Sequence, residues 1–577
     1  MRSSFFQSMQ CSLFFLLLIF LEGIGSINSS QLLAKEIDTA HQNNRQSTHQ
    51  LGINEESAIR IQNLGSHHFA VSTHNAQAQL FINQGLNLAY AFNHAEAYRA
   101  FQEAARLDPS LAMAYWGQAL VLGPNINAAM EPADEPGALA LIQKALLLLD
   151  DSVSTKERAL ILALSKRYTG TPVDRVANDH AYAAVMRLAY MQFPEDQDIA
   201  MLYVESMMNL RPWNYWMPDG QPYAGTNEIV SITEDVLKSN PKHPGALHLY
   251  IHLIEPTNTP ERAEPAADTL LTLMPDAGHM VHMPSHIYQR VGRYADSMRS
   301  NQLAIAVDEN YMMQCHPQGI YPMGYYPHNI HFLWFAATLD GQSQPAIDAA
   351  RKAASKISDE TLITLPAMAI FRVLPYWALT RFGHWQMMLE EPPPPKESAF
   401  LTGSWHYARG LAFVATKQLQ QAELALASLR ASLAMKDPNW DSPLFSPNTA
   451  RSVLAIGPEI LAGEIAAAKG KFDEAIRYLD RAVRLEDGLI YTEPSEWHFP
   501  PRLALGAILL EAGRPAEAET VYWEDLRRNR NNGWALYGLS QALRAQAKHD
   551  LASTIEDRFK LAWERSDLTL HASRMIR

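Results

Sequence analysis

A recurring pattern of small, aromatic and proline residues constrains the fold of this chain more than any other feature. Its first copy is marked by Phe81, Gly85, Ala97, Phe101, Ala104 and Pro109. The steps of three and four residues place side chains on one face of a helix, and the step of twelve leaves room for a turn. Proline cannot continue the second helix, so it marks the end of the unit. The pattern predicts two closely packed helices joined by a turn.

The same register recurs, with varying strength, along the chain. Further copies are marked by Ala263, Leu270 and Pro275; Tyr288, Gly292 and Ala304; Gly341, Ala346 and Ala353; Gly410, Phe413 and Ala422; Gly463, Gly470, Ala475 and Ala482; Gly506, Gly513 and Ala518; and Trp534 and Gly538. No run of alternating residues typical of strands accompanies them. The sequence therefore predicts an all-α solenoid of roughly nine or ten helical pairs.

These steps resemble the 34-residue tetratricopeptide repeat (TPR), a helix-turn-helix unit. The blocks GHMVHMPSHIYQRVGRY at 278–294, YYPHNIHF at 325–332 and GWALYGL at 533–539 also resemble a group of extracytoplasmic bacterial TPR proteins. The resemblance implies a right-handed superhelix of TPR helices and a location outside the cytoplasm. It implies no particular chemistry.

Composition shifts divide the chain further. Residues 27–75 are polar and lack apolar periodicity, which predicts a linker. We expect an N-terminal TPR array at 76–390 and a C-terminal one at 399–577, separated by the stiff run Pro392 to Pro395. The aromatic, proline-rich segment 210–226 is typical of an insertion.

The N-terminus has the order of a secretory signal. Arg2 precedes the apolar run Leu13 to Leu21, and small residues follow, which predicts a signal peptide at 1–26. The run is too short for an ordinary membrane span, although an uncleaved anchor stays an alternative, and we expect no other transmembrane segment. The predicted location is periplasmic or secreted. Signal removal would leave Cys315 as the sole cysteine, without an intrachain disulfide.

The charge balance excludes one class of partner. The chain carries 48 Lys and Arg against 61 Asp and Glu, for a formal charge of −13. Nucleic-acid-binding proteins normally show a basic surface, so we expect no nucleic-acid partner. Phosphate-binding loops, dinucleotide fingerprints and nucleophile elbows are also absent from the sequence.

Histidines gather in one segment. Nine of the 21 lie between His243 and His331. By resemblance to TPR helices, positions two, five, nine and twelve of each first helix line the concave groove, and seven of the nine occupy such positions. They are His248, His252, His279, His282, His286, His328 and His331. Residues three or four apart also share a helix face by geometry alone.

This gathering predicts a metal site. Our first-choice ligand set comprises His248, His252, His282 and His286 with Glu255, because two helices roughly 8–10 Å apart can supply four ligands to one ion. His328 and His331 either complete this set or form a second site with His279. Imidazole and carboxylate ligands suit Cu, Zn or Fe, and the interleaved methionines favour copper slightly.

Other readings stay open. A groove of this kind can instead bind a peptide or an envelope protein without metal, and buried histidines can be purely structural. With metal, the protein would capture and deliver the ion, hydrolyse a substrate with Glu255 or Glu205 as base, or oxidise one. Trp213 and Trp216 are candidates for an aromatic lid over the groove. Whether the protein is an enzyme and how it oligomerises are left open by the sequence.

Overall fold

A computed structural model describes residues 58–170, 173–315, 321–444 and 447–576 of the 577-residue chain. Within these ranges the chain is helical and contains isolated β-bridges but no strand. The prediction of an all-α solenoid is confirmed. The predicted signal peptide and residues 27–57 of the predicted linker lie outside the described residues.

The helices follow one another in the order of the sequence. The first group is α2 (Ala76–Tyr90), α3 (His94–Leu107), α4 (Ala112–Leu122), α5 (Glu135–Leu147), α6 (Thr155–Leu164), α7 (Arg175–Gln192), α8 (Gln197–Asn209) and α9 (Thr226–Ser239). The central group is α10 (Pro244–Ile254), α11 (Glu264–Leu270), α12 (Gly278–His282), α13 (Pro284–Val291), α14 (Tyr294–Cys315), α15 (Tyr326–Leu339) and α16 (Ser343–Ser355).

The last group is α17 (Asp359–Thr364), α18 (Ala369–Arg372), α19 (Leu374–Arg381), α20 (Trp385–Glu390), α21 (Ala399–Ala415), α22 (Leu419–Ala434), α23 (Ala450–Leu454), α24 (Ile456–Ala468), α25 (Phe472–Asp487), α26 (Pro501–Glu511), α27 (Pro515–Arg528), α28 (Gly533–Ala545) and α29 (His549–Ala562). Short 3-10 helices are η1 (Pro132–Asp134), η2 (Pro260–Ala263), η4 (Pro366–Met368) and η5 (Pro438–Asp441), and η3 (Tyr321–Tyr325) is a π-helical turn.

The first helical pair shows why the repeat pattern folds in this way. The ring of Phe101 on α3 is fully buried. A Cβ atom placed on Gly85 would come within 2.7 Å of this ring, and one on Gly117 within 2.4 Å. Because a real Cβ atom does not approach so closely, glycine at both positions lets α2 and α4 close on the ring. Tyr522 lies between Gly506 and Gly538 in the same manner near the C-terminus.

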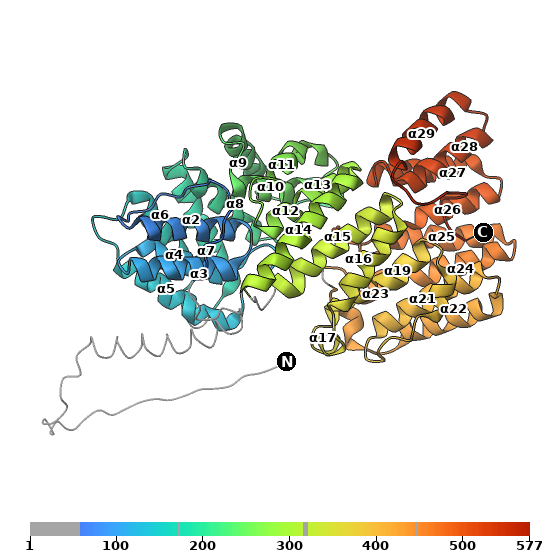
Figure 1. Cartoon of the computed structure of the whole chain (residues 1–577), viewed down its shortest axis with the longest axis horizontal. Helices are drawn as coiled ribbons and strands as arrows, with labels where there is room; N and C mark the ends of the chain where they lie inside the picture. Colours follow the sequence, from blue (N-terminus) through green and yellow to red (C-terminus); the bar gives the residue numbers. More distant parts are fainter. Residues whose placement is uncertain (1–57, 171–172, 316–320, 445–446, 577) are drawn as a thin grey trace, which may run out of the picture.

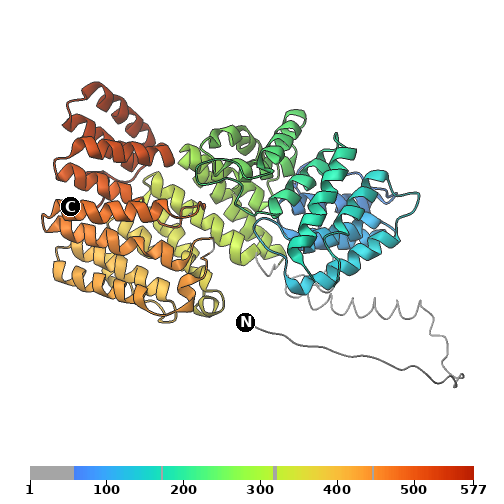
Figure 2. The same cartoon turned by 180° about the vertical axis from the view of Figure 1, so that it is seen from behind.

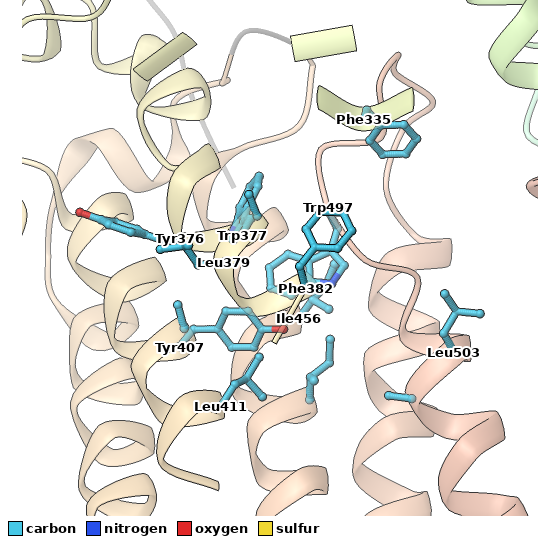
Figure 3. Packing of buried hydrophobic residues seen from close by; sticks show 14 of the residues in the cluster. Phe335, Tyr376, Trp377, Leu379, Phe382, Tyr407, Leu411, Ile456, Trp497 and Leu503 are labelled. Atoms are coloured by element: carbon cyan, nitrogen blue, oxygen red, sulfur yellow. The ribbon is translucent and has the colours of Figure 1, made fainter. Parts of the chain in front are cut away.

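Consecutive helices stack side by side from α2 to α29 (Figures 1 and 2). Their apolar faces form two clusters of buried residues, one extending from Leu64 to Tyr325 and the other from Tyr294 to Ile576. In the second cluster Trp497 packs near Trp377 and Tyr407, with ring centroids 6.0 and 5.2 Å away (Figure 3). The array boundary predicted at 392–395 stays a prediction, and the second cluster continues across it.

Two segments without long helices pack on the array. Residues 58–75 belong to the predicted linker, and Leu64 and Phe69 within them are buried. The backbone N–H of Phe69 donates a hydrogen bond to Asn83 Oδ1 at 3.1 Å. The aromatic insertion is anchored by Trp216, whose indole N–H donates to Leu253 O on α10 at 2.7 Å. The insertion is therefore fixed against a helix of the histidine segment.

None of the helices in the described ranges combines the length and apolar character that crossing a membrane requires.

Phe101→Ala should lower the free energy of unfolding by about 3–5 kcal/mol, because it leaves a cavity that two glycine-containing helices surround. Denaturant unfolding followed by circular dichroism measures the loss. Leu147→Ala is the matched control, since Leu147 is 72% exposed. Equal transitions for the two variants would contradict the packing role of Phe101.

Candidate metal centre

Four helices bring six histidines together. Helix α10 carries His248 and His252, four residues apart on one face. His282 ends α12 and His286 lies in α13, on either side of the break where Pro284 begins the new helix. The sequence analysis placed these side chains on the surface of a groove, whereas in the structure each is at most 1% exposed. They face one another in the interior.

The six rings divide into two groups of three. His248, His252 and His279 form one triad, and His282, His286 and His328 form the other; within each triad one nitrogen per ring lies within 4.8 Å of the others. The two triads adjoin, because the ring centroids of His252 and His286 are 5.7 Å apart and those of His279 and His282 are 5.9 Å apart.

Hydrogen bonds fix the tautomers of the α10 pair. His248 Nδ1 lies 2.6 Å from Tyr90 O, and His252 Nδ1 lies 2.9 Å from Glu255 Oε1. Carbonyl and carboxylate oxygens only accept, so both Nδ1 atoms carry the proton and donate it. In a neutral ring the other nitrogen then holds a lone pair. The two Nε2 atoms face each other at 3.1 Å.

The second pair repeats this arrangement with different acceptors. His282 Nδ1 lies 2.7 Å from Asn301 Oδ1, and the amide is oriented because Asn301 Nδ2 donates to Ser297 O at 2.8 Å. His286 Nδ1 lies 2.6 Å from Glu255 Oε2. The Nε2 atoms of His282 and His286 again face each other, here at 2.9 Å.

Each triad is completed by a histidine from a later helix, His279 on α12 for the first triad and His328 on α15 for the second. His279 is 2% exposed, and neither of its ring nitrogens has a hydrogen-bond partner within the described chain. Its backbone N–H donates to Tyr321 Oη at 3.2 Å, and Tyr321 in turn donates to Asp308 at 2.9 Å. In the second triad, the ring of His328 lies 4.9 Å from that of His282.

Glu255 connects the two triads and has no exposed surface. One carboxylate oxygen accepts from His252 and the other from His286. The sequence analysis proposed Glu255 as a ligand or base; the structure places its oxygens behind the rings, on Nδ1 atoms. Glu493, between α25 and α26, brings Oε2 within 3.3 Å of His286 Nδ1 and accepts a hydrogen bond from Tyr491.

Burial lowers the pKa of five of the six histidines. It lowers the pKa of His248 to about 4 and that of His252 to about 3. Burial also holds the pKa values of His279, His282 and His328 well below the ordinary range, and neighbouring histidines add to each depression. These rings are therefore unprotonated near neutral pH.

A cavity of about 380 Å³ adjoins both triads. His252 and His279 of the first triad and His286 and His328 of the second line it. Its other walls are formed by Ile126, Asn127, Trp213, Tyr325, His331, Ala367, Ile370, Phe371, Leu444, Pro447, Tyr491, Thr492, Glu493, Pro494 and Glu496. A small molecule in this cavity would contact histidines of both triads.

The remaining predicted residues occupy different places. Trp213 lines the cavity, and its ring centroid lies 4.9 Å from that of His252. Trp216 does not line the cavity and is hydrogen-bonded to the Leu253 carbonyl. His331 lines the cavity but stacks on Trp334 at 5.4 Å and belongs to neither triad. Glu205 on α8 is not among the residues that line the cavity, and burial raises its pKa to about 7.

The sequence analysis missed several residues of the site. Phe92 packs on His248 and Phe332 on His286, with centroids 4.4 and 4.5 Å apart. Asn301, Glu493 and the Tyr90 carbonyl are the other omissions. Asn301 follows His282 closely in sequence, so a search for acceptors on the next helix could have found it. Glu493 lies outside any helix and carries no such signal.

Comparisons with known proteins add little to this geometry. No family model matches the chain, and no curated protein matches it in sequence. A chain of the crystal structure of the APC/C hetero-tetramer Cut9–Hcn1 is 12% identical, with a TM-score of 0.30 over 91% of this chain and 81% of that one. The human IFIT1 dimer with m7Gppp-AAAA is 12% identical, with a TM-score of 0.31 over 91% and 95%. Similarity at this level carries no argument about function.

In the metal-free protein, the free energy of unfolding should fall as the pH decreases from about 6.5 to about 4. Unfolded histidines bind protons in this window, whereas folded His248, His252 and His331 do not, with pKa values of about 4, 3 and 3. Each contributes up to about 1.4 kcal/mol per pH unit. Denaturant unfolding at several pH values measures the slope.

His331→Phe should make this slope shallower, because Phe keeps the packing on Trp334 and removes a titratable ring. His549→Phe, at an exposed position, serves as the control. An equal slope for the wild type and His331→Phe would show that His331 does not contribute.

Proposed function

We propose that each triad binds one transition-metal ion, the first through His248, His252 and His279 and the second through His282, His286 and His328. One observation carries this proposal. In both His–His pairs the Nδ1 protons are committed to oxygen acceptors, which leaves two Nε2 lone pairs facing each other at 3.1 and 2.9 Å.

Such an arrangement needs a positive centre between the nitrogens. A shared proton would make one ring of each pair cationic, and burial opposes that charge. A metal ion satisfies both lone pairs at once. Two imidazole nitrogens about 2.0–2.1 Å from one ion, at angles of about 90–110°, lie about 2.9–3.4 Å apart, which matches both distances.

Glu255 acts on the metal sites through the histidines. A carboxylate that accepts the Nδ1 proton fixes the ring orientation and makes Nε2 a stronger donor to the metal. Here one carboxylate serves a histidine of each triad. We therefore assign Glu255 a positioning role rather than that of a ligand.

The ligand set indicates the kind of metal and its use. Imidazole nitrogens suit Cu, Zn or Fe. Three histidines leave a coordination position open, which is typical of catalytic rather than structural sites. A bound ion there supplies Lewis acidity, an activated water or redox chemistry. Because histidines of both triads line the cavity, we propose a metal-assisted reaction on a small molecule held in it.

We further propose that the protein acts outside the cytoplasm, in the periplasm or as a secreted protein. The signal-like order of residues 1–26 and the resemblance to extracytoplasmic bacterial TPR proteins support this location. Cell fractionation combined with mass spectrometry of the mature N-terminus tests it.

A metal-free scaffold that binds an envelope protein or peptide is the second candidate function. Helix α7 favours it, because Val176, Leu188 and Met191 are 70%, 62% and 65% exposed on this helix. Exposed apolar side chains that gather on one helix are typical of interaction surfaces. Recovery of an envelope partner that Leu188→Glu abolishes would support this function.

The untagged protein, expressed with ample metal, should contain about two metal ions per chain by elemental analysis. His279→Ala should retain about one, because it removes a ligand from the first triad only, and His279→Ala/His328→Ala should retain almost none. His331→Ala is the control and should keep two. A metal content below about a tenth of an equivalent per chain in the wild type would refute the metal proposal.

Glu255→Gln should lower metal affinity by about 10–100-fold, because glutamine replaces one of the two acceptors with a donor. Competition with a chromophoric chelator measures the affinity, and circular dichroism checks the fold. Glu205→Gln, at a partly buried carboxyl that does not line the cavity, is the matched control. An affinity equal to that of the wild type would argue against the positioning role.

A further inference from the structure

The described wall of the cavity carries acidic side chains but no strongly basic ones. Glu493 and Glu496 line the cavity, and among the described residues no lysine or arginine does. An anionic ligand would therefore meet two carboxyl groups and no strongly basic side chain.

Glu496 is the less satisfied of the two carboxyl groups. It is 4% exposed, and neither of its oxygens has a hydrogen-bond partner in the described part of the chain. Burial raises its pKa to about 8, and the nearby Asn448 amide opposes only part of the rise. Leaving a buried acceptor without a donor is unfavourable, so the group would gain from a ligand that donates hydrogen bonds.

The rest of the wall is apolar and aromatic. Trp213, Tyr325 and Phe371 contribute rings, and Ile126, Ile370 and Leu444 contribute aliphatic surface. Aromatic faces attract organic cations as well as hydrocarbon groups. The volume of about 380 Å³ lies within the usual range for small-molecule sites.

We infer that the cavity binds a small primary amine as its ammonium ion, with the nitrogen at the Glu496 carboxylate and the hydrocarbon part against Trp213, Tyr325 and Phe371. The ammonium group supplies the donors that Glu496 lacks and the charge that stabilises its ionised form. The idea that the metals act on this amine rests on the proposed function. The binding of the amine does not depend on that function.

The two kinds of charge would orient the ligand. A metal ion in either triad repels an ammonium group, while Glu496 attracts it. The amine therefore binds with its nitrogen at the carboxyl group and its carbon skeleton toward the histidines. An anionic ligand would not be oriented in this way, because Glu496 would not attract it.

Three probes of similar size and different charge test this inference: 2-phenylethylamine, 2-phenylethanol and 3-phenylpropionate. Isothermal titration calorimetry at pH 7.5 is done on the full-length protein, both metal-loaded and after metal removal. We expect the amine to bind at least about tenfold more tightly than the alcohol or the acid in both forms. Binding of the alcohol or the acid as tightly as the amine would overturn the inference.

Glu496→Gln should remove the preference for the amine while leaving binding of the alcohol and the metal content unchanged. Glu205→Gln is the matched control and should keep the preference. If Glu496→Gln fails to fold by circular dichroism, the comparison of the three probes on the wild type still decides the matter.

Failure of the two proposals would look different. Absence of metal together with selective amine binding would refute the metal sites and leave the amine site standing. Two metal ions per chain without amine selectivity would support the metal sites and refute the amine site.

Discussion

The histidine cluster depends on the hydrogen bonds that the buried carboxylate of Glu255 accepts. This carboxylate accepts from His252 on α10 and from His286 on α13, and so fixes which nitrogen each ring presents to its neighbour. Arg290 donates to the Glu255 carbonyl at 2.9 Å and to Thr257 O at 2.9 Å, which holds the chain around the carboxylate. Without this group, two rings in an apolar interior would lose the acceptor that determines their tautomer.

The repeat architecture makes such a cluster possible. Stacked helices present equivalent positions at regular intervals, so histidines in similar register on α10, α12–α13 and α15 meet without any long loop. The break before Pro284 keeps His282 and His286 on neighbouring helical segments whose Nε2 atoms still approach to 2.9 Å. Solenoids usually bind ligands on their surfaces, but here the histidine cluster lies in the interior between the helices.

Much of this could be predicted from the sequence. The steps around Phe101 predict helical pairs, and the repeat register indicates His248, His252, His282 and His286 as candidate ligands. The division into two triads could not be predicted, because it depends on how far His279 and His328 reach across neighbouring helices. The burial of the cluster was also missed, since helical register gives a face but not what covers it. Glu493 and Glu496 lie in a connecting segment, and no periodic pattern relates this segment to the histidine-bearing helices far earlier in the chain.

Five of the six histidines are buried and His328 is partly buried, which has a kinetic consequence. An ion bound between rings that are almost inaccessible to solvent can leave only through the adjoining cavity or by local opening of the helices. Exchange with the surroundings is then governed by the rate of such opening rather than by affinity alone. If the triads bind metal as proposed, the ion present while α10 and α13 close around Glu255 would influence their occupancy, so the compartment in which folding takes place would help to select the ion.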